Sequence, residues 1–210
     1  MRLVVFMTYS VGLSNWKAER IFDREVALYK KYREDGNKVI VVSYGSNEEN
    51  KMSLGSAVDQ VLCNKYRLPH WLYALLLPYL YGIELRNADV FKSNQMRGAS
   101  VALRCAEKFN KPLVVRQGYG LYEFLLRGGK SKTIQAKIAM RYEAKCLKNA
   151  DAVISTTSEL QASCIARYQI NSNKMFIVPN YVVPEIWSPA YVGRIVEDKF
   201  KFVYDFKIFL

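Results

Sequence analysis

The segment DAVISTTSELQASCIARYQINSNKMFIVPN, residues 151–180, holds two short, mostly apolar runs with an amphipathic stretch between them. The runs at 151–156 and 174–180 have the length of strands, and the stretch at 158–169 has the spacing of a helix. Apolar runs without alternation are typical of strands covered on both faces. The order strand, helix, strand predicts a right-handed crossover between two parallel strands.

The same alternation extends upstream to the first residues. It predicts a doubly wound α/β domain, Rossmann-like, with a mostly parallel sheet and helices on both faces. The expected strands lie at 2–9, 38–45, 59–63, 88–93 and 112–117, and the expected helices at 18–35, 70–83, 98–110 and 131–150.

Composition narrows the classes of function. Half of the 210 residues are hydrophobic and the formal net charge is +12, so we expect a folded domain with a basic surface attracted to anionic partners. No nucleic-acid motif occurs, which leaves anionic lipid or phosphorylated substrates and predicts no nucleic-acid partner. Four separated cysteines and the single histidine, His70, predict free thiols and no metal site. The apolar run 68–83 is too short to span a membrane, and we expect a buried helix there, or alternatively a helix lying at a membrane surface.

A glycine turn follows the expected strand 112–117. Gly118 and Gly120 match the first two glycines of a dinucleotide fingerprint, but Glu123 stands in place of the third, so a nicotinamide or flavin site is not favoured. Ligands of open α/β sheets bind at the carboxyl ends of strands, where this turn lies. We therefore expect a ligand contact there, with a merely structural turn as the alternative. The candidate residues are Arg116, Gln117, Gly118 and Tyr119.

Two other loops follow strands at the same expected edge. Gly12 would let backbone N–H groups approach a ligand, and Lys17 either meets a phosphate or stays a solvated loop lysine. Asn94 and Gln95 suit a polyhydroxylated ligand, although both are also ordinary capping residues. Neither a P-loop nor a Ser/His/Asp set occurs, so the catalytic residues stay unknown.

A basic and partly apolar segment runs from the glycine turn through the helix expected at 131–150. Lysines beside large apolar side chains are what contact with an anionic membrane surface requires. A solvated basic face is the alternative. The predicted membrane residues are Phe124, Leu125, Arg127, Lys130, Lys132, Lys137, Arg141 and Lys145.

Taken in order, these pieces resemble the amino-terminal domain of glycosyltransferase family 4, the retaining nucleotide-sugar enzymes of the GT-B fold. The resemblance covers about residues 1–190. It rests on Gly12 and on four stretches: FDREVALYKKYREDGNKVIVVSYG (22–45), ADVFKSNQMRG (88–98), KPLVVRQGY (111–119) and KCLKNADAVISTTSELQASCIARYQINSNKMFIVPNYV (145–182).

The resemblance implies two Rossmann-like domains facing a cleft, with acceptor bound by the first and nucleotide-sugar donor by the second. It implies no further cofactor, and a role in cell-surface polysaccharide or lipid-linked glycan synthesis at the cytoplasmic face of the cell membrane. By position, Gly12 would border donor phosphates and acceptor, and the residues from Arg116 to Tyr119 would line the cleft.

Departures from the family pattern shape the remaining expectations. Gln117 and Gly118 stand where many members have a histidine, and no two glutamates have the family's seven-residue spacing. After a domain at 1–180 and a linker at 181–198, residues 199–210 read as the start of a second domain. We therefore expect a truncated chain that is inactive alone, with the donor half missing or supplied by a second chain. We also expect residues 199–210 to favour self-association. The alternative is a non-catalytic Rossmann-like module that binds membrane, glycan or a partner chain.

Overall fold

The computed structural model describes residues 1–19, 21–52, 57–129 and 133–181. The chain divides into two compact units, Met1–Pro179 and Asn180–Leu210, and every element below belongs to the first. Apart from Tyr181, the predicted linker and the predicted start of a second domain lie outside the described residues.

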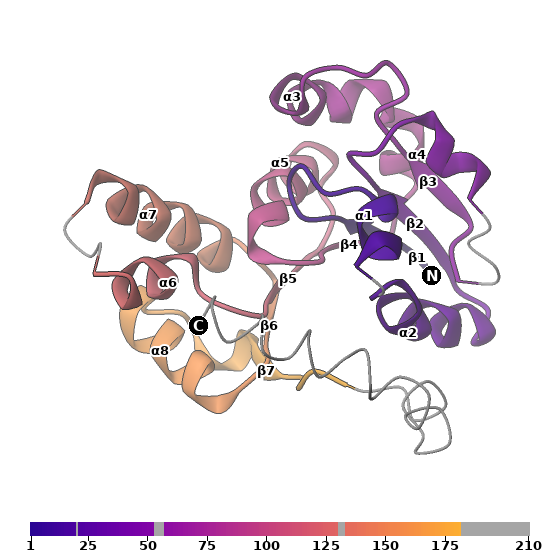
Figure 1. Ribbon diagram of the computed structural model, residues 1–210. Helices are drawn as coiled ribbons and strands as arrows, with labels where there is room; N and C mark the ends of the chain where they lie inside the picture. Colours follow the sequence, from indigo (N-terminus) through magenta and orange to yellow (C-terminus); the bar gives the residue numbers. More distant parts are fainter. Residues whose placement is uncertain (20, 53–56, 130–132, 182–210) are drawn as a thin grey trace, which may run out of the picture. The chain divides into compact units, whose positions relative to one another are not determined.

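A parallel sheet of seven strands forms the centre of the first unit, in the order β3-β2-β1-β4-β5-β6-β7 (Figure 1). The order reverses beside β1, as in a doubly wound sheet. The predicted fold class is therefore confirmed. The strands are β1 Arg2–Phe6, β2 Lys38–Val42, β3 Gln60–Leu62, β4 Val90–Ser93, β5 Leu113–Gln117, β6 Ala152–Ser155 and β7 Met175–Ile177.

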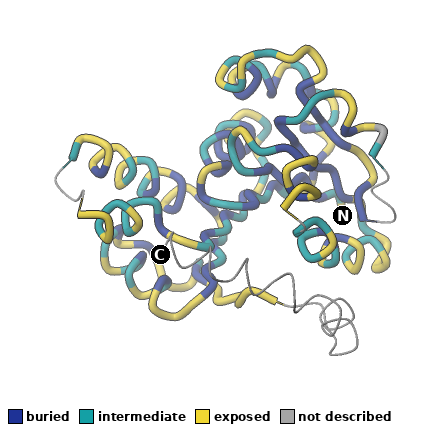
Figure 2. The backbone as a smooth tube through the Cα atoms, viewed as in Figure 1, coloured by how far each residue is buried: buried dark blue, intermediate teal, exposed yellow. Residues whose placement is uncertain are grey.

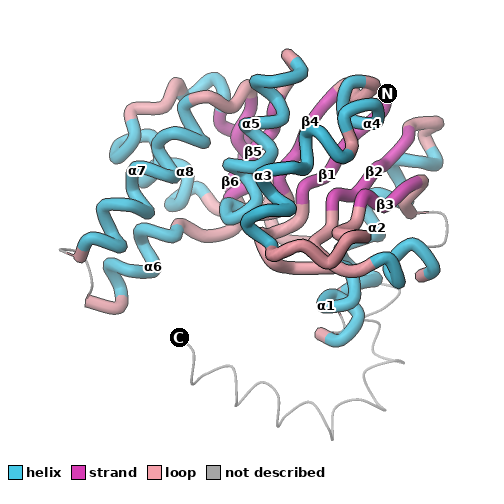
Figure 3. Tube along the Cα trace, turned by 90° about the horizontal axis from the view of Figure 1, so that it is seen from above, coloured by secondary structure: helices cyan, strands magenta, loops and turns pink. Residues whose placement is uncertain are grey.

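Helices cover the two faces of the sheet unequally, as Figure 3 shows from a second direction. On one face α1 (Leu13–Ala18) and α2 (Phe22–Glu34) pack over β1, β2 and β3. The helices whose residues pack on the other face are α3 His70–Leu80, α4 Gly82–Arg86, α5 Ala99–Phe109, α7 Ile134–Lys148 and α8 Ser158–Tyr168. The remaining elements are α6 Leu121–Arg127 and three 3-10 turns, η1 Asn47–Lys51, η2 Met96–Gly98 and η3 Ser172–Lys174.

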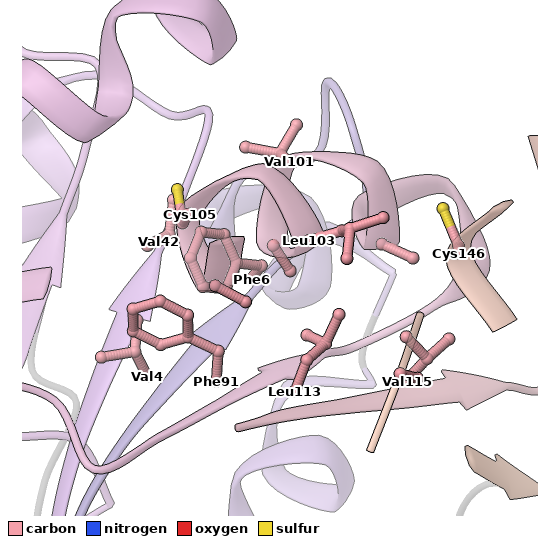
Figure 4. Close-up of a cluster of buried hydrophobic side chains, with 14 of the residues drawn as sticks. Val4, Phe6, Val42, Phe91, Val101, Leu103, Cys105, Leu113, Val115 and Cys146 are labelled. Carbon is pink, nitrogen blue, oxygen red and sulfur yellow. The ribbon is translucent and has the colours of Figure 1, made fainter. Parts of the chain in front are cut away.

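Alternate residues of the strands supply two separate cores. The larger core contains Phe6, Phe91 and Val115 with residues of α5, and Figure 4 shows these side chains meeting between strand and helix. The smaller core joins Val5 and Val41 to α1 and α2. Burial of each large apolar side chain contributes about 1.5–3 kcal/mol, so the buried residues of strands and helices together stabilise the fold (Figure 2).

Two predicted helices differ from those observed. The helix expected at 18–35 is observed as α1 and α2, separate helices whose bounds are Leu13–Ala18 and Phe22–Glu34. The helix expected at 70–83 ends at Leu80, and α4 follows from Gly82. Pro78 is nevertheless inside α3, where it cannot donate to the carbonyl of Ala74. The Arg104 guanidinium donates to that carbonyl instead, which explains how the helix tolerates the proline.

The four cysteines are buried free thiols, as predicted, and burial raises the pKa of Cys105, Cys146 and Cys164 to about 12. Among the described residues, no group of three or more His, Cys, Asp or Glu side chains could hold a metal ion. None of the helices in the described part of the chain is long and apolar enough to cross a membrane.

Candidate functional site at the carboxyl edge of the sheet

The turn at Gly118 is held between the loops that follow β4 and β6. The Gly118 N–H donates to Oε1 of Gln95 at 3.2 Å, and the Gly118 carbonyl accepts from the Thr156 hydroxyl at 3.2 Å. A side chain at this position would place Cβ 2.8 Å from Gln95 Oε1. Gly118 therefore packs closely on the end of the Gln95 side chain.

Arg116, on β5, is bound to the end of β4 and the loop that follows it. The Arg116 backbone N–H donates to the Ser93 hydroxyl at 3.2 Å, and its guanidinium donates to the Asn94 carbonyl at 3.3 Å. Asn94 is buried, whereas Tyr119 is about half exposed beyond the turn. The structure thus brings together five of the predicted ligand residues: Asn94, Gln95, Arg116, Gly118 and Tyr119. Ligand binding by these residues stays a prediction.

Gln117 has a different environment from its neighbours. Its side chain is buried, accepts from the Cys164 thiol at 2.9 Å, and lies 3.5 Å from the Glu143 carboxylate. The side chain therefore points into the larger core rather than toward a ligand, because β5 alternates and Gln117 shares the inner side with Leu113 and Val115.

The start of α6 is occupied by Glu143, a fully buried carboxylate of α7. The backbone N–H groups of Leu121 and Tyr122 donate to it at 2.5 and 3.4 Å, and the Tyr168 hydroxyl donates at 2.5 Å. These N–H groups are the ones that a helix start otherwise offers to a bound anion. In this protein they are bound to an internal carboxylate.

Glu123, which stands where a dinucleotide fingerprint has its third glycine, joins α6 to α8. It accepts from the Ser163 hydroxyl at 2.5 Å and from the Arg167 guanidinium at 3.3 Å. The same guanidinium lies over the Tyr122 ring, 4.9 Å from its centroid. The glutamate is thus part of a helix–helix contact, and the turn lacks the close helix–strand packing that the third glycine serves.

Gly12 lies beside a second internal carboxylate. Glu49 of η1 is buried and accepts from the backbone N–H of Ser14 at 2.9 Å, from its hydroxyl at 2.6 Å and from the Ser43 hydroxyl. A Cβ on Gly12 would lie 2.5 Å from Glu49 Oε1. The space next to Gly12 and the start of α1 therefore hold Glu49. Contact between Gly12 and donor phosphates stays a prediction.

Lys17 and Lys92 differ in how far their side chains are exposed to solvent. Lys17 is exposed, with its ammonium 5.3 Å from the Phe22 ring centroid. Lys92 is half-buried on β4 and donates to the Tyr29 hydroxyl at 3.2 Å. Burial, together with the Arg116 guanidinium, lowers the pKa of Lys92 to about 8, although Glu25 acts in the opposite direction.

Lys92 gives a pH-dependent prediction. Its ordinary pKa is 10.5, so the folded protein releases this proton first and the Lys92 contribution to stability rises with pH between about 8 and 10.5. Relative to Lys92→Met, the wild type should gain about 1 kcal/mol between pH 7.5 and 9.5, after allowance for partial exposure. Urea denaturation of both proteins at several pH values measures this. A constant difference across that range would contradict the lowered pKa.

The predicted membrane residues are mostly exposed. Phe124 on α6 and Ile134 and Ile138 on α7 are 62–76% exposed, and no residue of α6 is buried. Leu125 is half-buried. Arg127, Lys137, Arg141 and Lys145 are exposed around them, whereas Lys130 and Lys132 lie outside the described residues. We call Phe124, Arg127, Ile134, Lys137, Ile138, Arg141 and Lys145 the basic face.

A second exposed apolar surface lies on α3 and α4, where we expected a buried helix. Only one side of α3 is buried, through Tyr73, Ala74, Leu77 and Pro78. The opposite side of α3, together with Ile83 of α4, carries large apolar residues at four-residue spacing that are 49–78% exposed. These residues, which we call the apolar stripe, are Trp71, Leu75, Tyr79 and Ile83.

Several solved structures share this fold. Residues covering 94% of the chain superpose on 49% of HepE from Anabaena in complex with UDP-glucose (TM-score 0.62, 14% identity). The same share of the chain matches 52% of sucrose-phosphate synthase from Thermosynechococcus elongatus (TM-score 0.63, 14% identity). For the lipopolysaccharide outer core galactosyltransferase WaaB, 87% of the chain matches 46% of that protein (TM-score 0.52, 13% identity).

The chain therefore spans about half the length of these structures, as expected for an amino-terminal domain. At such low identity the similarity shows the fold alone. No curated protein sequence is significantly similar to this one. The family profile described as Glycosyltransferase Family 4, however, matches residues 26–186, which is most of the domain. The chain belongs to glycosyltransferase family 4.

Proposed function

We propose that this chain is the acceptor-binding half of a retaining glycosyltransferase that moves a sugar from a nucleotide-sugar to a glycan or lipid-linked acceptor in cell-surface polysaccharide synthesis. The observation that carries the proposal is the family match over residues 26–186. HepE, one of the structural neighbours, is a complex with UDP-glucose, which supports a nucleotide-sugar as the donor with no further cofactor. WaaB, by its name, acts on lipopolysaccharide, which supports a surface-glycan acceptor.

The two buried glutamates support an acceptor role for this half. A donor diphosphate needs N–H groups or cations that are free to meet its charge. At the starts of α1 and α6, backbone N–H groups already donate to Glu49 and Glu143. Beside the Gly118 turn, exposed Tyr119 and half-buried Gln95 remain as side chains that suit sugar hydroxyls. We therefore propose that a further domain or a second chain supplies donor binding.

A transfer assay tests the proposal. The purified chain is incubated with UDP-glucose and other nucleotide-sugars and with lipid-linked glycan acceptors, alone and together with any donor half encoded beyond the Leu210 codon. We expect acceptor binding but no transfer by the chain alone, and transfer once the donor half is added. Robust turnover by the chain alone would contradict the need for a second half. Acceptor binding without transfer in the completed pair would favour a non-catalytic module.

We also propose that the chain works at the inner face of the cell membrane. Two features support this: the basic face, where exposed lysines and arginines accompany exposed Phe124, Ile134 and Ile138, and the apolar stripe, which begins with exposed Trp71. Anionic lipid attracts the first, and the interfacial region of a bilayer accommodates the second. Lys108, whose ammonium lies over the Tyr79 ring, adds a cation beside the stripe.

Vesicle flotation measures both contributions. Lys137→Glu with Arg141→Glu should weaken binding to vesicles containing anionic lipid at least 10-fold, since each cation near the surface contributes about 1 kcal/mol. Leu75→Ser with Tyr79→Ser should weaken binding by a similar factor, because two exposed apolar side chains lose their burial in lipid.

The matched controls lie on α2, which packs on the other face of the sheet. Lys30→Glu with Lys31→Glu repeats the charge change, and Leu28→Ser removes an exposed leucine. We expect neither control to alter binding more than twofold. Equal losses in a test variant and its matched control would show that the loss of binding is not specific to the surface tested, and would rule out that surface as the membrane contact.

A further inference from the structure

A hollow of about 340 Å³ opens beyond the ends of β2 and β3, at the same carboxyl edge as the Gly118 turn. Its size is at the lower end of the range for small-ligand pockets. A hollow of about 370 Å³ beside Leu113 and Asp151 lies at the amino edge, where ligands of such sheets do not bind, and we assign it no role. The hollow at the carboxyl edge is lined by Tyr44, Ser46, Asn64, Arg67, Leu68 and His70.

An aromatic cluster forms one wall of this hollow. The Tyr44 ring makes edge contacts with Tyr9, His70 and Tyr73, at centroid distances of 5.2, 5.5 and 5.5 Å. The residue is only 5% exposed, so its ring is held in place by this packing. Tyr44 thus gives the hollow a rigid aromatic wall.

Arg67 is fixed at the rim of the hollow by the turn that follows β3. Asn64 donates to the Leu68 carbonyl at 2.7 Å and accepts from its N–H at 3.0 Å, which closes the turn on both sides. Arg67 within it has φ of +52°, an uncommon conformation for a residue other than glycine. The backbone conformation of Arg67 is thus fixed, and both Arg67 and His70 line the hollow.

The charge at the rim is not firmly neutralised. The carboxylate paired with Arg67, that of Glu48, is 3.9 Å away, and the two side chains are 79% and 82% exposed. Such exposed pairs contribute at most about 1 kcal/mol and exchange readily with other anions. A guanidinium also binds carboxylate or phosphate through two parallel hydrogen bonds.

From this combination we infer that the hollow is an acceptor subsite for a sugar that carries an anionic group. The sugar ring lies against the aromatic wall, the Ser46 hydroxyl binds its polar edge, and Arg67 with His70 binds the carboxylate or phosphate. The inference rests on the proposed function and names the class of acceptor. Two further strands separate β2 from β5, so an acceptor reaching from here to the Gly118 turn spans about 15 Å.

NMR titration of the isotope-labelled chain tests the subsite with three probes: glucuronate, glucose 6-phosphate and glucose. We expect both anionic probes to shift the signals of Tyr44, Arg67 and His70 and to bind at least 10-fold more tightly than glucose. Arg67→Gln should remove that preference. Ser46→Ala should weaken all three probes several-fold. The stronger anionic probe then distinguishes a uronic acid from a phosphorylated sugar.

Arg86→Gln, an exposed arginine at the end of α4, is the matched control and should change nothing. Equal binding of glucose and the anionic probes, or no shift at Tyr44, Arg67 and His70, would overturn the subsite. Because the titration needs no donor, its result is independent of the transfer assay. Anionic probes bound at the hollow with no transfer by the completed pair would leave the subsite standing and remove the proposed activity.

Discussion

Replacing Glu143 with alanine is expected to lower the free energy of unfolding by about 3–5 kcal/mol, the range observed when one partner of a buried charged network is removed. The carboxylate is fully buried and accepts hydrogen bonds from two backbone N–H groups of α6 and from the Tyr168 hydroxyl. Each donor left without a partner costs about 1–3 kcal/mol, and alanine also leaves a cavity. Chemical denaturation of both proteins measures the difference.

Two further variants separate this role from a general effect of losing a glutamate. Glu143→Gln keeps the shape and one acceptor oxygen, so its loss should be about half that of alanine. Glu107→Ala removes an exposed glutamate from α5 and should stay within about 0.5 kcal/mol of the wild type. Hydrogen exchange of the Leu121 and Tyr122 amides should accelerate in Glu143→Ala alone. Unchanged exchange there would contradict the role assigned to Glu143.

Neither buried glutamate could be identified from the sequence. Glu143 bonds to residues 21 and 22 positions away, and Glu49 bonds to Ser14 at a separation of 35. Local patterns predict caps within a few residues, whereas these carboxylates reach the helix starts only after the sheet has assembled. The strands, by contrast, were predictable, because each is an apolar run of consecutive residues, as in β1 and β2.

Gln117 and α3 differ in how far the sequence predicts which side chains are buried. The alternation of β5 would have assigned Gln117 to the buried side with Val115, so its inward side chain was predictable from period two. In α3, by contrast, every residue from Trp71 to Leu80 is apolar, apart from the tyrosine hydroxyls. Periodicity cannot distinguish the face of such a helix that packs from the face that stays exposed. The apolar stripe therefore became visible only in the folded chain.

Gly45→Ala is expected to destabilise the protein by about 3 kcal/mol or more. Backbone strain is not the cause, because the φ angle of Gly45 is not positive. A Cβ there would lie 2.0 Å from Cδ and 2.1 and 2.4 Å from the two oxygens of Glu49. That carboxylate cannot simply rotate away, because Ser14 and Ser43 hold it by hydrogen bonds. The alanine must therefore expel a buried side chain and leave its donors without a partner.

A double-mutant cycle identifies the cause. Glu49→Ala alone should cost about 2–3 kcal/mol, but adding Gly45→Ala to it should cost under 1 kcal/mol, since the group that the methyl would meet is gone. Gly82→Ala, where nothing lies within 4 Å of the added carbon, should be neutral or slightly stabilising. Additive losses in the cycle would place the effect of Gly45→Ala elsewhere. A strong coupling would also explain Gly12 as a residue that makes room for Glu49, since its own Cβ would meet the same carboxylate.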